Sequence, residues 1–203
     1  MDTLYNQTLR QLDKSFRRLE VLVPPPQKVP HGDSFVFRYK EQTIHQALIQ
    51  KLARMVSGLH AARLLCANGM LQEQGTIHRM LDEFHEDIWF LAFAIINDDR
   101  TQHHQVYLDA FYQEEFDPVT GKSSLDRPML PRRRIRNYLA NLPQQPQDPS
   151  SAVSLSHTIH SANSGFVHGA SPHIMDMYGG NPPQYHIHGM AGTPRHEDHR
   201  YDL

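Results

Sequence analysis

Apolar residues recur at spacings of three and four along most of the chain, which predicts an all-α protein. The first such stripe predicts a helix from about residue 3 to residue 20, and its members are Tyr5, Leu9, Leu12, Phe16 and Leu19. Prolines at 24–26 and at position 30 follow it. Because proline lacks an amide donor and disfavours helix in the preceding residue, residues 1–30 are expected to be an N-terminal helix and a proline-rich linker.

Two longer stripes predict helices over about 41–67 and 71–97, separated by Asn68 and Gly69, which suit a left-handed helix end. We expect a helical bundle built around this central antiparallel hairpin. The second half of each helix is apolar on nearly every side, so Leu64, Trp89 and Phe93 are expected to be covered by other helices.

The rest of the chain predicts shorter elements. Helices are expected over 102–116, 131–142 and 150–168, and the alternation at 35–39 is expected to be an extended lead-in more than a strand. A bundle domain over 31–170 would then precede an irregular, loop-rich and histidine-rich tail over 171–203. Thr193-Pro194 begins a helix close to the last residue, which favours a shortened version of a longer chain over a frayed turn.

Composition narrows the function classes. The chain has 203 residues, 39% apolar residues and a net charge of −2, so nucleic acid or an anionic membrane would need a local basic patch. Its longest apolar run, 88–96, is far shorter than the roughly 20 residues that span a bilayer. The polar start lacks a signal-peptide layout, and a single cysteine, Cys66, excludes an intrachain disulfide. We therefore expect a soluble, cytoplasmic protein with no membrane partner.

Fifteen histidines are the most unusual feature of the composition. On the helix over 150–168, His157, His160 and His168 lie opposite the apolar face, and imidazoles one turn apart can share a transition metal such as zinc. Ser164 and His168 are alternatively a general acid-base pair where the helix meets the following loop. The competing interpretation is an ordinary solvated face with no cofactor.

Carboxylates give a second candidate site on the helix over 71–97. Asp82 and His85 have the spacing of a di-metal bundle motif, but no facing helix supplies a matching pair. The alternative is a solvated flank with local ion pairs such as Arg79 with Glu83. Asp87, like Glu73, borders the apolar stripe and would need partners if buried.

A third candidate site is a cluster of arginines around the start of the helix over 131–142. Cations are unfavourable at a helix start unless an anion neutralises them, which predicts RNA or another anion as a ligand. The anion is alternatively internal, supplied by acidic residues at 114–117. The cluster consists of Arg127, Arg132, Arg133, Arg134 and Arg136.

Two segments, RMLDEFHEDIWFLA (79–92) and SHTIHSANSGFVHGAS (156–171), carry a family resemblance. They resemble bacterial helical proteins that are loosely similar to the HEPN group, over about residues 40–170. The resemblance implies a helical bundle with a helix-end motif, here Ser164, His168 and Gly169. Catalytic HEPN proteins are RNases in which four to six residues separate an arginine from the histidine that follows it, and no arginine precedes His168 at that distance.

These observations predict a binding or regulatory module of HEPN-like type that contacts RNA, nucleotide or protein through His168 and the arginine cluster. The alternatives are a metal-dependent enzyme that uses His157, His160 and His168, and a scaffold that only oligomerises. An amphipathic first helix needs a partner for its apolar stripe, so a homo-oligomer formed through that helix is also expected.

Overall fold

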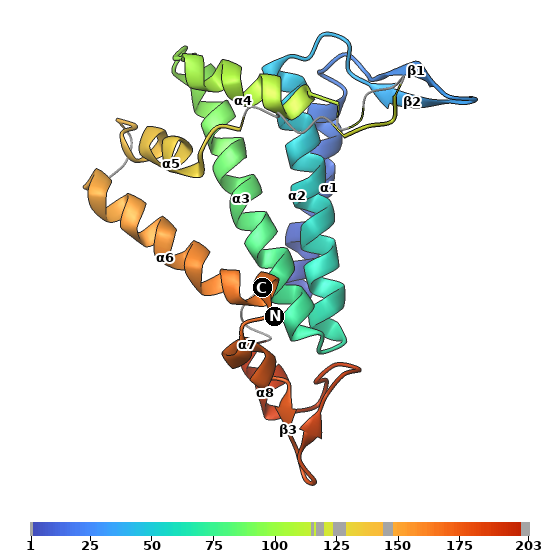
Figure 1. Ribbon diagram of the computed structural model, residues 1–203, viewed down its shortest axis with the longest axis vertical. Helices are drawn as coiled ribbons and strands as arrows, with labels where there is room; N and C mark the ends of the chain where they lie inside the picture. Colours follow the sequence, from blue (N-terminus) through green and yellow to red (C-terminus); the bar gives the residue numbers. More distant parts are fainter. Residues whose placement is uncertain (1, 115, 117–119, 124–128, 144–147, 200–203) are drawn as a thin grey trace. The chain divides into compact units, whose positions relative to one another are not determined.

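The computed structural model describes residues 2–114, 116, 120–123, 129–143 and 148–199, and it confirms the mainly helical class (Figure 1). In the described ranges, no helix combines the length and the apolar character needed to cross a bilayer. The helices are α1 (Asp2–Glu20), α2 (Ile44–Ala67), α3 (Leu71–Ile96), α4 (Gln102–Tyr112), α5 (Arg132–Ala140), α6 (Pro149–His168), α7 (Ser171–Met175) and α8 (Pro194–His199). The strands are β1 (Gln27–His31), β2 (Ser34–Arg38), β3 (Tyr178–Gly179) and β4 (Gln184–Tyr185).

The chain divides into two compact units that are not continuous in sequence. Unit 1 contains residues 1–53 and 86–142, and unit 2 contains residues 54–85 and 143–203. The two central helices α2 and α3 contribute residues to both units. This division therefore cuts across the expected sequential segments 1–30, 31–170 and 171–203.

The core of unit 1 is built where the start of α2, the end of α3, α4 and α5 meet. Its members are buried aliphatic and aromatic side chains that face one another across these four helices. The buried members are Ile44, Ala47, Phe90, Leu91, Ala94, Leu108 and Ile135.

A histidine lies inside this core. His104 has no exposed surface, and its ring stacks on Phe90 with 4.0 Å between ring centroids. Its Nδ1 accepts a hydrogen bond from the Thr101 amide at 3.0 Å, so Nε2 carries the proton and donates to the Phe90 carbonyl at 3.2 Å. Both ring nitrogens are used by the neutral ring. Desolvation by burial accordingly lowers the pKa of His104.

The segment expected to be a linker and an extended lead-in instead forms an antiparallel hairpin of β1 and β2. His31 pairs with Ser34, so the loop has two residues, and Gly32 at its first position has φ +55°. Pro30 lies next to this closing pair, where the alternating ladder requires no amide donor. The interpretation of the prolines as linker alone was therefore wrong for residues 27–31.

The expectation that the apolar ends of the central helices are fully covered was also wrong. Trp89 is 42% exposed and Leu64 is 64% exposed, whereas Phe93 is half-buried and stacks on Trp89. In unit 1, the core takes the α3 face that carries Phe90, Leu91 and Ala94. Trp89 lies beside that face, because successive helical residues differ by about 100° in direction.

In unit 2, glycines bring helices close together. A Cβ atom on Gly75 of α3 would lie 2.6 Å from the Phe166 ring of α6. Similarly, a Cβ atom on Gly165 would lie 2.1 Å from the ring of His173 in α7. The Phe166 and His173 rings pack edge to face at 4.5 Å. Glycine disfavours a helix interior, and the close approach of the Phe166 ring explains why Gly75 occurs within α3.

The C-terminal segment packs on the turn between α2 and α3. The Met190 amide donates to the Gly69 carbonyl at 2.8 Å, and the buried His196 ring donates from Nε2 to the Cys66 carbonyl at 2.7 Å. Both Gly69 and Gly189 have positive φ and contact backbone too closely for a Cβ atom. Within the expected tail, the described residues 171–199 are thus irregular, as expected, but they are docked within unit 2.

We expect Gly75→Ala to destabilise the protein by about 1 kcal/mol or more, because overpacking against the Phe166 ring outweighs the helix propensity that alanine gains. Gly58→Ala is the matched control, since the nearest atom to its Cβ is a single δ-methyl carbon of Leu81 instead of an aromatic ring. Urea unfolding of both variants measures the difference. A Gly75→Ala variant more stable than the original chain would contradict the close packing.

We expect His104 to make the protein less stable as the pH falls from 7 to 5. The unfolded chain takes up a proton near the ordinary pKa of 6.5, whereas the folded chain, with its lowered pKa, resists protonation. The contribution is at most about 1.4 kcal/mol per pH unit. Urea unfolding at several pH values should show this slope reduced in His104→Gln and retained in the exposed control His103→Gln.

Candidate anion-binding site around helix α5

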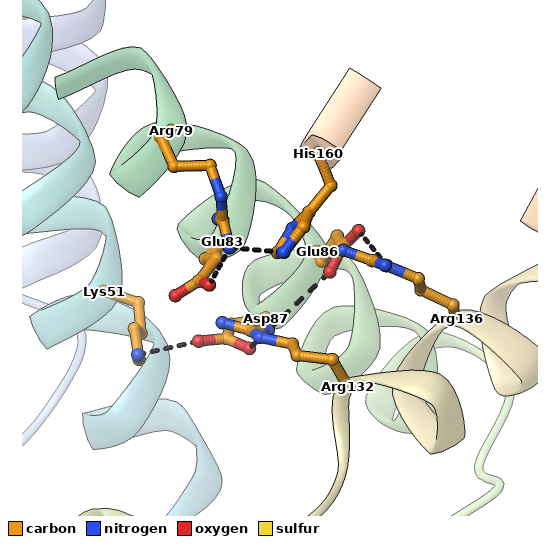
Figure 2. A network of polar contacts seen from close by, with 8 residues as sticks. All are labelled: Lys51, Arg79, Glu83, Glu86, Asp87, Arg132, Arg136 and His160. Atoms are coloured by element: carbon orange, nitrogen blue, oxygen red, sulfur yellow. Dashed lines mark hydrogen bonds and ion pairs between the residues drawn. The ribbon is translucent and has the colours of Figure 1, made fainter. Parts of the chain in front are cut away.

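A buried carboxylate organises the polar residues of unit 1. Asp87 of α3 is 1% exposed, and its Oδ2 accepts a hydrogen bond from Lys51 Nζ of α2 at 2.7 Å. Its Oδ1 accepts from Arg132 at the start of α5. The expectation that a buried Asp87 would need partners is confirmed, whereas Glu73 is exposed. Each oxygen of the Asp87 carboxylate therefore has its own cation (Figure 2).

The neighbouring carboxylate holds the next turn of α5. Arg136 is 8% exposed, and its Nε donates to Glu86 Oε1 at 2.7 Å. Arg132 lies 3.8 Å from the other oxygen of Glu86. Consecutive acids on α3 thus bind arginines four residues apart on α5, as Figure 2 shows. Among the described residues, three cations bind two carboxylates in this network.

Aromatic rings shield the network on the α4 side. Lys51 Nζ lies 5.2 Å from the centroid of the Phe111 ring and 5.8 Å from that of Tyr107. Burial raises the pKa of Tyr107 well above its ordinary value, with the Asp87 charge as the second cause. The phenol is therefore neutral at physiological pH, and the shielded ion pairs are stronger than pairs in water.

The remaining arginines of the cluster have a different environment. Arg133 and Arg134 are exposed, and no ion pair joins either of them to another described residue. Helix α5 begins after Pro131, and within the described ranges no side chain caps its first amides. Exposed guanidinium groups and uncapped amides therefore share the start of α5, which favours an anion. Arg127 lies outside the described residues.

Internal carboxylates of α3 bind two arginines of the cluster, Glu86 with Arg136 and Asp87 with Arg132. Of the acids considered in the sequence, Glu114 pairs with Arg38 of β2, while 115 and 117 lie outside the described residues. The signal for Asp87 was present in the sequence, because an acid at the border of an apolar stripe is buried only with a partner.

The histidines of α6 in unit 2 have different environments. His157 is exposed, and His168 is exposed at the last residue of α6, followed by Gly169 with φ +63°. His160 is half-buried, and its Nε2 accepts a hydrogen bond from Arg79 of α3 (Figure 2). Ser164 is half-buried on the same helix.

The environments of these histidines can be compared with what a metal site requires. Among the residues that the structure describes, no three histidine, cysteine or acidic side chains are placed to hold one ion. The guanidinium of Arg79 lies at the His160 ring, where a positive group opposes a second cation. His157, His160 and His168 as metal ligands, with zinc as the example, stay a prediction from the sequence.

The carboxylate flank in unit 2 forms local pairs. Arg79 binds Glu83 at 2.7 Å, which confirms the ion pair expected on this flank. Asp82 accepts a hydrogen bond from Asn163 of α6 at 3.1 Å. His85, which follows Arg79 at the spacing of the RNase motif, is exposed, and Arg79 instead contacts His160.

No protein-family model, curated protein or solved structure matches this chain. The candidate site is therefore defined by its own geometry. The start of α5 is held by ion pairs to α3 and carries exposed guanidinium groups and amide donors, which can bind phosphate or carboxylate groups.

We expect Asp87→Asn to lower the free energy of unfolding by about 3 kcal/mol, because the neutral amide removes the buried negative charge that Lys51 and Arg132 bind. Glu114→Gln is the matched control, since it removes an exposed carboxylate from an arginine and should cost less than about 1 kcal/mol. Chemical unfolding monitored by circular dichroism measures both. Equal losses in the two variants would contradict the central role of Asp87.

Proposed function

We propose that this chain is a helical binding or regulatory module of HEPN-like type that contacts the phosphates of RNA or a nucleotide through the start of α5. The observation that carries the proposal is that the described arginines of the cluster fall into two groups with different environments. Arg132 and Arg136 bind internal carboxylates, whereas Arg133 and Arg134 on the same helix are exposed.

The ion pairs of Arg132 and Arg136 with α3 support recognition because they hold the helix that presents the exposed charges. Side chains on a rigid helix lose less freedom on binding than side chains on a mobile loop. Arginine also donates two parallel hydrogen bonds to a phosphate, which a lysine cannot do.

The network supports binding more than catalysis. A general base needs an available lone pair, but both oxygens of Asp87 accept from cations, and Tyr107 keeps its proton. Ser164 and His168 stay a predicted catalytic or contact pair on α6. The proposed role of α5 does not depend on them.

We expect the paired substitution Arg133→Gln with Arg134→Gln to weaken binding of a fluorescein-labelled single-stranded RNA 12-mer. The slope of log affinity against log salt should become shallower by about 1.4, because two phosphate contacts are lost at about 0.7 each. Fluorescence anisotropy at salt concentrations between about 50 and 200 mM measures the slope.

The control changes net charge by the same amount at exposed positions of α1. Arg10→Gln with Lys14→Gln should leave the salt slope unchanged if α5 is the phosphate contact. The proposal fails if the original chain does not bind the RNA at low salt. It also fails if both double variants change the slope equally, since binding would then depend on net charge alone.

A further inference from the structure

The β1–β2 hairpin presents one aromatic and basic face. Lys28 pairs with Phe37 across the strands, and Pro30 pairs with Phe35, so the four side chains lie on the same side of the hairpin. Phe35 is 46% exposed and Phe37 is 56% exposed. Two half-exposed phenylalanines on a two-stranded hairpin leave apolar rings in water, which indicates a surface for a ligand.

The geometry of this face is defined by ring and charge contacts. The Phe35 and Phe37 rings are 5.5 Å apart with an interplanar angle of 84°. Lys28 Nζ lies 4.1 Å from the centroid of the Phe35 ring. The face thus combines π-surfaces with an ammonium group held beside them by a cation–π contact.

The hairpin is anchored from its other side. Arg38 follows Phe37 and so points to the opposite face, where it binds both carboxylate oxygens of Glu114, one of them at 2.9 Å. This pair holds β2 against the end of α4 and leaves the aromatic face uncovered. A fixed platform binds with a smaller loss of conformational entropy than a mobile one.

We propose that the aromatic face of the β1–β2 hairpin stacks the bases of single-stranded RNA, while Lys28 contacts a neighbouring phosphate. Because α5 is proposed to bind phosphates of the same ligand, this inference rests on the proposed function. Base stacking on exposed aromatic side chains of a small sheet, with cations along the backbone, is a general mode of single-strand recognition.

The charge of the hairpin favours RNA over an apolar partner. Arg38 pairs with Glu114, and the other charged residues of 27–40 are two lysines, Lys28 and Lys40, against one carboxylate, Asp33. Asp33 lies in the polar loop at the tip, where a hairpin that inserted into an anionic membrane would need apolar residues. A purely apolar protein surface would leave Lys28 desolvated without a counter-charge.

The test compares RNA with a base-free ligand. We expect the original chain to bind an oligouridine 12-mer more tightly than an abasic 12-mer of equal charge, as measured by anisotropy at one salt concentration. Phe35→Leu with Phe37→Leu should weaken oligouridine binding about fivefold or more and should leave abasic binding unchanged, because leucine keeps the apolar volume but has no π-face. Phe116→Leu, an exposed ring outside the hairpin, is the control.

The outcomes separate this inference from the proposed function. If the original chain binds both oligomers equally and Arg133→Gln with Arg134→Gln weakens both, the platform is wrong and the α5 site stands. If bases strengthen binding but the hairpin variant does not change it, the platform is also wrong. A third outcome would assign the face to a membrane instead. In that case the original chain binds phosphatidylserine vesicles, the hairpin variant does not, and RNA binding does not depend on the bases.

Discussion

The arrangement of helices in the described part of unit 1 depends on the ion pairs of Asp87. A carboxylate that is 1% exposed is stable only with counter-charges, and it obtains them from α2 and from the start of α5. One side chain on α3 therefore joins three helices at a defined register. The apolar core alone could accommodate small shifts of these helices, because hydrophobic contacts have little directionality.

This constraint also determines which charges remain for a ligand. Glu86 and Asp87 are adjacent on α3, and they select two arginines one turn apart on α5, Arg132 and Arg136. Of the positions between them, Ile135 joins the apolar core, whereas Arg133 and Arg134 are exposed, because residues of a helix differ by about 100° per step. Arg133 and Arg134 are thus directed to solvent by the same geometry that buries their neighbours.

Helix periodicity predicted the helical class, the central helix pair and the need of a buried Asp87 for partners. Pairing between distant segments was not predictable, because spacing within a helix does not tell which facing helix supplies a counter-charge. The arginine cluster was recognised, but its partners on α3 were not. Trp89 was expected to be buried because its whole segment is apolar, yet coverage depends on how many helices surround α3, which the sequence does not specify.

The hairpin shows a second reason why the sequence was incomplete. Its strands contain Pro30 and follow three consecutive prolines, and these residues favour a linker in any local analysis. A strand becomes stable through its partner, and here Gly32 allows the tight loop that brings β1 and β2 together. Local propensity and pairing therefore disagree in this segment. The result is an exposed pair of aromatic side chains, anchored through Arg38, in the same unit as the exposed arginines of α5.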